Sequence, residues 1–191
     1  MIPVTVLYED ARDQKTKGFG LHDLVVQCVC DALGRAPWDV GKMLIGQPKN
    51  GANKLRAECQ RNMDKLAAKG GWVFAVYDAD RIRERIGLTV NACRQSVIDR
   101  LKDGCACADH LDVVLLESNL ESVLHALRAI YPALETDETW RRAIEGKKHD
   151  ARDLLFTAAA KPSPLMRPVR EALLAQQPSF ARLVARIARV L

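Results

Sequence analysis

The sequence predicts an α/β protein with a mainly parallel four-stranded sheet flanked by helices, and two observations support this prediction. Short apolar runs alternate with helical patterns through about residue 130, which is typical of βαβ units and a parallel sheet. The run WVFAVY, residues 72–77, is apolar throughout and rich in β-branched and aromatic side chains. A run this short and uniform is typical of a strand buried on both faces. Beyond Pro132 the strand signal disappears, and we expect an all-helical C-terminal extension.

The composition allows a full hydrophobic core but does not indicate which kind of partner the protein binds. A chain of 191 residues has room for one sizeable domain or for a domain with a helical appendage. The net charge of +5 is a mild excess, which permits contact with a polyanion but does not demand it. Aromatic residues are few, which argues against a base-stacking platform for single strands.

The first part of the chain predicts a strand followed by a helix. Residues 2–8 form a strand-like run, and Pro3 lies at its start, where a missing N–H donor costs little. Residues 11–20 are polar and basic, as expected for a loop. Apolar residues recur with a helical spacing over 21–33, and Gly34 closes that helix.

Two further elements precede the central strand. Residues 40–45 are a weaker strand candidate, and 46–51 have the composition of a turn. A polar, basic helix is expected over 52–68, and the glycine pair at 70–71 ends it before the strand at 72–77.

The second half begins with a charged connection at 81–85, a helix over 90–101 and a fourth strand over 111–116. A helix is then expected to run to residue 130. Within the C-terminal extension, prolines separate four more helical patterns, at 139–144, 150–159, 167–175 and 179–191.

No apolar run reaches membrane-spanning length, and no basic region precedes an apolar one at the N-terminus. We therefore expect no signal peptide, no membrane contact and a cytoplasmic location. The cysteines lack zinc-ligand spacing, and we interpret them as reduced, mostly buried thiols. The pair Cys105 and Cys107 lies in an expected loop, and its role stays open.

Acidic residues follow three of the four predicted strands. Glu9 follows the first strand, Asp78 and Asp80 follow the third, and Glu117 follows the fourth. The carboxyl ends of parallel strands share one edge of a sheet, where open α/β folds bind their ligands. Carboxylate oxygens at one edge are suited to Mg²⁺ or Mn²⁺. Glu121 is either a further ligand or an acid in the first turn of the next helix.

A structural interpretation of the same acids is that Asp78 caps the next helix and Asp80 is solvated. The basic loop with Lys15 and Lys17 instead favours phosphate as a partner. The sequence contains no P-loop, dinucleotide-binding or nucleophile-elbow motif. The four histidines are scattered, and only His22 lies beside the basic loop.

The ordered set of Glu9, Asp78-x-Asp80 and the acid-rich LESNLE at 116–121 resembles the TOPRIM domain of topoisomerases, primases and OLD-family nucleases. The helical tail after it is similar to OLD-type and related small TOPRIM proteins of phage-defence operons. The resemblance places a TOPRIM-like domain at 1–131 and a helical extension at 132–191.

The resemblance implies a metal-dependent nuclease. Glu9 matches the first-strand glutamate, a metal ligand or general acid/base, and Asp78 and Asp80 match the metal-binding pair. Glu117, together with Glu121, matches the acid of the fourth strand in OLD-type sites. Lys147 and Lys148 are both candidates for a basic residue near the site.

The leading hypothesis is therefore Mg²⁺- or Mn²⁺-dependent hydrolysis of DNA or RNA, by an effector of bacterial anti-phage defence. The alternative is a non-catalytic interaction or sensor subunit that docks on a separate ATPase through its helical tail. A third hypothesis is phosphoryl transfer to a small nucleotide at the same edge. Whether the chain forms a homo-oligomer stays open.

Overall fold

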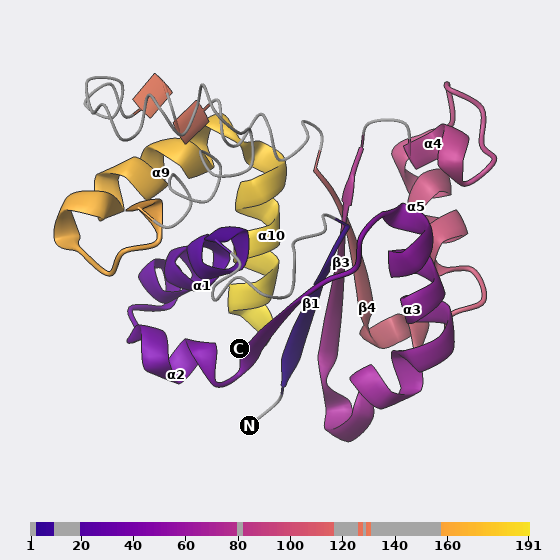
Figure 1. Cartoon of the computed structure of the whole chain (residues 1–191), viewed down its shortest axis with the longest axis horizontal. Coiled ribbons are helices and arrows are strands. Elements are labelled where there is room, and N and C mark those ends of the chain that lie inside the picture. The colour runs from indigo at the N-terminus through magenta and orange to yellow at the C-terminus, as the bar shows by residue number, and fades with distance from the viewer. Residues whose placement is uncertain (1–2, 10–19, 80–81, 117–125, 128, 131–157) are drawn as a thin grey trace. The chain divides into compact units, whose positions relative to one another are not determined.

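A computed structural model describes residues 3–9, 20–79, 82–116, 126–127, 129–130 and 158–191 and confirms the predicted α/β class (Figure 1). Four parallel strands form one sheet in the order β2-β1-β3-β4. Their bounds are β1 Val4–Tyr8, β2 Leu44–Pro48, β3 Trp72–Asp78 and β4 Leu111–Leu116.

The two central strands are apolar and buried. All five residues of β1 are buried, and so are the five consecutive residues from Val73 to Tyr77 in β3. Because successive side chains of a strand point to opposite faces, this burial confirms that both faces of β3 are covered. In register, Val4 lies beside Trp72 and Tyr8 beside Val76.

Helices α3 Ala52–Leu66, α4 Ile82–Arg85 and α5 Arg94–Lys102 cover one face of the sheet (Figure 1). On α3, Leu55, Cys59 and Met63 recur at four-residue intervals and are fully buried. They belong to the same core cluster as Val73 and Ala75 of β3. The predicted basic helix therefore presents an apolar stripe to the sheet and Lys54, Arg61 and Lys65 to solvent, whereas Arg56 is half-buried.

The weaker strand candidate at 40–45 is displaced along the chain. Helix α2 Pro37–Gly41 occupies its first residues, since proline is favoured at the start of a helix. The strand itself begins at Leu44 and ends at Pro48. It is an edge strand that pairs only with β1 among the described strands, and an edge tolerates the Pro48 ring.

The chain divides into two compact units, and the sheet with α3, α4 and α5 forms the first. The second contains α1 Gly20–Leu33, α2, α9 Arg167–Gln176 and most of α10 Pro178–Val190. Helices α9 and α10 confirm the last two predicted helices. The predicted 131/132 domain boundary, the helix at 139–144 and most of that at 150–159 lie outside the described residues.

None of the helices in the described ranges is both long and apolar enough to span a membrane.

The cysteines are free thiols in contrasting environments. Cys28, Cys30 and Cys59 are buried, and burial raises the pKa of Cys28 and Cys59 to about 12. Cys93 is exposed at the N-cap of α5, where hydrogen bonds with the hydroxyl and backbone N–H of Ser96 lower its pKa. The expectation of mostly buried thiols therefore holds for α1 and α3, but Cys93 and Cys107 are exposed and Cys105 is half-buried.

Arg170 joins α9 to α1 within the second unit. Its side chain is 2% exposed and forms two bonds with Asp31, Nε–Oδ2 at 2.5 Å and Nη2–Oδ1 at 3.2 Å. Its Nη1 donates to the carbonyls of Ala159, at 2.9 Å, and Lys161, at 3.0 Å. A buried guanidinium with this many partners offsets its desolvation, but removal of one side would leave a buried charge unpaired.

We predict that Arg170→Ala lowers the free energy of unfolding by about 3–5 kcal/mol because it leaves two carbonyls without their donor and Asp31 with Gln27 in place of its counter-ion. Arg167→Ala is the matched control, since Arg167 forms an exposed pair with Glu171 on the same helix, worth about 0.3–0.5 kcal/mol. Urea denaturation of both variants measures the difference. Equal losses in the two variants would contradict a structural role for Arg170.

We also predict that iodoacetamide labels Cys93 first in the folded protein and labels Cys28 and Cys59 at least about 100-fold more slowly. The lowered pKa of Cys93 means that its labelling extends to lower pH, whereas the raised pKa of the buried thiols keeps them protonated. Peptide mapping by mass spectrometry measures the order. Labelling of Cys59 as fast as Cys93 without denaturant would refute this burial pattern.

Candidate functional site

Glu9 lies directly after β1 and is held by its backbone on two sides. Its N–H donates to the carbonyl of Val76 in β3 at 3.0 Å, which extends the strand pairing by one residue. Its own carbonyl accepts from the N–H of Gly51, which precedes α3, at 2.6 Å. The position of Glu9 is therefore fixed by the sheet and by the start of α3.

The Glu9 side chain is 9% exposed and both of its carboxylate oxygens have partners. Oε2 accepts a hydrogen bond from the backbone N–H of Asp78 at 3.0 Å. Oε1 forms a short ion pair with Nη1 of Arg85, on α4. The structure thus places the Glu9 carboxylate beside the backbone of Asp78, another predicted site residue, on a neighbouring strand.

The other predicted acids, Asp80, Glu117 and Glu121, lie outside the described residues. Their described neighbours show where the chain leaves the sheet. Ala79, which precedes Asp80, donates from its N–H to the carbonyl of Leu116 at 2.9 Å. The ends of β3 and β4 are therefore still paired at the edge where Glu9 and Asp78 meet.

The structure does not test the remaining basic and histidine candidates. Lys15, Lys17, Lys147 and Lys148 lie outside the described residues. His22 lies in α1, which belongs to the second compact unit.

Basic residues of other segments surround the described acids. The backbone N–H of Lys49 donates to the carbonyl of Tyr8 at 2.9 Å, beside the end of β1, and its ammonium pairs with Glu58 at 3.1 Å. Arg94, the first residue of α5, donates to the carbonyl of Leu115 near the end of β4 at 3.3 Å. Together with Arg85, these side chains place positive charge at the carboxyl edge of the sheet.

Sequence reasoning missed Arg85 and Arg94 as site residues. The composition of the run RIRER at 81–85 predicts only a charged connection. Its position directly after Asp78-x-Asp80 was the available signal, because a basic segment beside several acids can supply their counter-ions.

Tyr77 lies beneath this edge and is not available as a base. It is 1% exposed, and burial first, then the nearby Cys59 thiol, raises the pKa of its phenol. Its hydroxyl and the Nε of Arg56 are buried without a hydrogen-bond partner in the part of the chain that the structure describes. The phenol therefore stays neutral near pH 7.

The described acids provide the right kind of donor for a hard cation, but only part of a ligand set. Carboxylate oxygens are the ligands that Mg²⁺ and Mn²⁺ prefer. Within the described ranges no three His, Cys, Asp or Glu side chains form a group that could hold a metal ion. Glu9 and Asp78 thus fit a metal site that further oxygen ligands have to complete.

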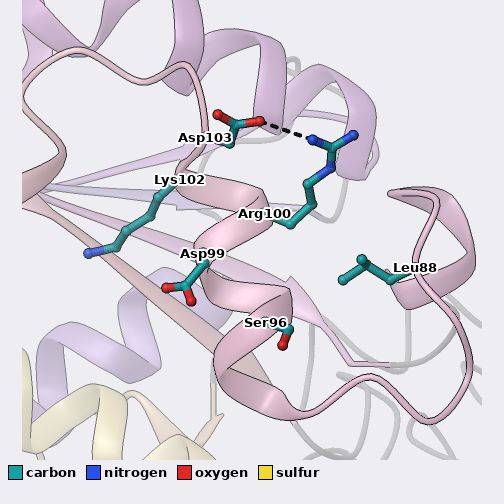
Figure 2. A pocket seen from close by; sticks show the side chains of 6 residues that line it. All are labelled: Leu88, Ser96, Asp99, Arg100, Lys102 and Asp103. Carbon is teal, nitrogen blue, oxygen red and sulfur yellow. Dashed lines mark hydrogen bonds and ion pairs between the residues drawn. The ribbon is translucent and has the colours of Figure 1, made fainter.

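A separate hollow of about 600 Å³ lies along α5 (Figure 2). Its acids already have partners: Asp99 accepts from Gln95 at 2.7 Å, and Asp103 pairs with Arg100 at 3.0 Å. Figure 2 shows the Lys102 side chain extending away from the Arg100–Asp103 pair. No predicted site residue lines this hollow, so the carboxyl edge is the better candidate.

The chain matches no protein-family model, no curated protein and no solved structure. The function is therefore inferred from the side chains at the carboxyl edge and from the resemblance of the sequence motifs.

We predict that Glu9 and Arg85 are energetically coupled by about 1–2 kcal/mol, because one partner of the pair is buried. A double-mutant cycle of Glu9→Gln and Arg85→Gln, measured by urea denaturation, gives this value. The exposed Arg100–Asp103 pair is the control and should couple by less than about 0.5 kcal/mol. Equal coupling in the two pairs would show that the burial of Glu9 adds nothing.

Proposed function

We propose that the protein is a metal-dependent nuclease of TOPRIM type, which hydrolyses phosphodiester bonds of DNA or RNA with Mg²⁺ or Mn²⁺. The observation that supports this most directly is the hydrogen bond from the Asp78 N–H to the Glu9 carboxylate. It joins the ends of two adjacent parallel strands that bear the acids of the TOPRIM-like pattern. The proposed setting is the bacterial cytoplasm, as an effector of anti-phage defence.

The order of the motifs along the chain supports the same proposal. Asp80 follows Asp78 after one residue, and Glu117 directly follows β4. Because β3 and β4 stay paired through Ala79 and Leu116, both acids continue from backbone that lies at this edge. Asp80, Glu117 and Glu121 are accordingly the proposed remaining ligands.

Each described side chain has a defined task in this proposal. Glu9 and Asp78 hold the metal on rigid strand ends, so that little reorganisation accompanies binding. When bound, the metal supplies Lewis-acid polarisation of the scissile phosphate and lowers the pKa of a coordinated water. Lys49 and Arg94 supply positive charge that attracts the phosphate backbone to the edge.

A second candidate function is a non-catalytic interaction or sensor subunit that docks on a separate ATPase. It is favoured by the fact that both Glu9 oxygens already have protein partners, Asp78 and Arg85. A carboxylate neutralised in this way can serve to join β1, β3 and α4 without any ligand. Metal binding and cleavage assays distinguish the two functions.

We predict that Asp78→Ala lowers Mn²⁺-dependent cleavage of labelled DNA or RNA at least about 100-fold, because it removes a metal ligand. Asp99→Asn, which changes an exposed acid of α5, should leave cleavage unchanged. Circular dichroism and thermal unfolding establish that both variants fold, and calorimetry with Mn²⁺ should show loss of binding in an Asp78→Ala/Asp80→Ala variant. Full cleavage by a folded Asp78→Ala protein would refute the mechanism.

A further inference from the structure

We propose that Arg85 is an exchangeable counter-ion: it neutralises Glu9 in the metal-free protein and turns to a substrate phosphate when Glu9 takes up a metal. This inference rests on the proposed function and adds a phosphate-binding residue to it. The ion pair between Arg85 and Glu9 provides the starting point.

The two partners of this pair are held very differently. Glu9 is 9% exposed and is fixed by its backbone contacts with Val76 and Gly51 and by the N–H of Asp78. Arg85 is 45% exposed and ends the four-residue helix α4. Across the described residues, its side chain makes one hydrogen-bonded contact, the pair with Glu9. The pair can therefore open by movement of Arg85 alone, while Glu9 stays in place.

The other arginines near this edge contact backbone carbonyls. Nε of Arg83 donates to the carbonyl of Ala92 at 2.8 Å, and Nη2 of Arg94 donates to that of Leu115 at 3.3 Å. Those contacts hold loops and helices in place and do not involve an acid. The Arg85 contact differs from these two because its partner is an acid and a predicted metal ligand.

The guanidinium of Arg85 and a metal ion would compete for the carboxylate of Glu9. Glu9 and Asp78 bring like charges to one edge, and a cation lowers their repulsion. A guanidinium and a divalent cation at the same carboxylate repel each other, so occupation by one weakens binding of the other. Removal of Arg85 should consequently strengthen metal binding, although it removes a favourable contact from the fold.

The chemistry of arginine makes a substrate phosphate a suitable new partner for Arg85 once a metal has displaced it from Glu9. Its planar guanidinium has five N–H donors and binds phosphate as readily as carboxylate, in a bidentate manner. A phosphodiester at the metal site would lie at the same edge as the released side chain. Arg85 thus serves as the counter-ion of Glu9 when substrate is absent and as a phosphate ligand when substrate is bound.

The test is a calorimetric titration with Mn²⁺ of the full-length wild type, Arg85→Ala, Arg85→Lys and the charge control Arg100→Ala. We expect Arg85→Ala to bind Mn²⁺ about tenfold more tightly, with Arg85→Lys in between and Arg100→Ala unchanged. Cleavage assays on the same proteins should show a KM for nucleic acid raised at least about tenfold in Arg85→Ala. Thermal unfolding establishes that each variant is folded, and Arg85→Lys tests the proposal if Arg85→Ala is not.

The outcomes separate the two proposals. Binding of Mn²⁺ by the wild type with unchanged or weaker affinity in Arg85→Ala would overturn the counter-ion role and leave the nuclease proposal standing. Tighter binding with an unchanged KM would overturn the transfer to phosphate. Absence of Mn²⁺ binding in every variant would overturn both proposals. Binding of Mn²⁺ only by the variants that lack Arg85 would support its role as the counter-ion of Glu9.

Discussion

The register between β1 and β3 is the constraint on which the candidate site depends. Tyr8 lies beside Val76, and the next N–H along, that of Glu9, donates to the same Val76. This pairing brings the Glu9 carboxylate within 3.0 Å of the Asp78 N–H. A slip of one residue would exchange the faces of every side chain in β1 and separate the two acids. The apolar residues of both strands, by fixing the register, therefore fix the site.

Burial of Glu9 has a desolvation cost, which the local structure offsets. An ionised carboxylate removed from water needs hydrogen bonds or a counter-charge. The N–H of Asp78 supplies the first and Arg85 of α4 supplies the second. The short helix α4 is in turn anchored by Ile82, which is buried in the core beneath it. Packing of Ile82 in the core thus positions α4, and α4 in turn positions the arginine that neutralises Glu9.

Sequence patterns predicted the strands whose position depends on local composition. Strands β1, β3 and β4 are mainly apolar, and the shared edge of their carboxyl ends follows from parallel pairing. The edge strand β2 has no such run, and pairing with β1 decides where it begins. The Glu9–Arg85 contact joins residues 76 positions apart, so no local pattern indicates it. Arg170 and Asp31, 139 positions apart, were unpredictable for the same reason.

A comparison of the Arg170–Asp31 and Glu9–Arg85 ion pairs bears on the interpretation of the edge. Arg170 is 2% exposed, and its donors are distributed over Asp31 and two carbonyls, as expected for a guanidinium that only holds elements together. Arg85 is 45% exposed and binds one acid. A purely structural role for Glu9 would be served best by a partner of the first kind, because a buried arginine with several acceptors is held in place more firmly than a half-exposed one with a single acceptor. The observed partner is of the second kind, as the proposed exchange of Arg85 for a metal ion requires.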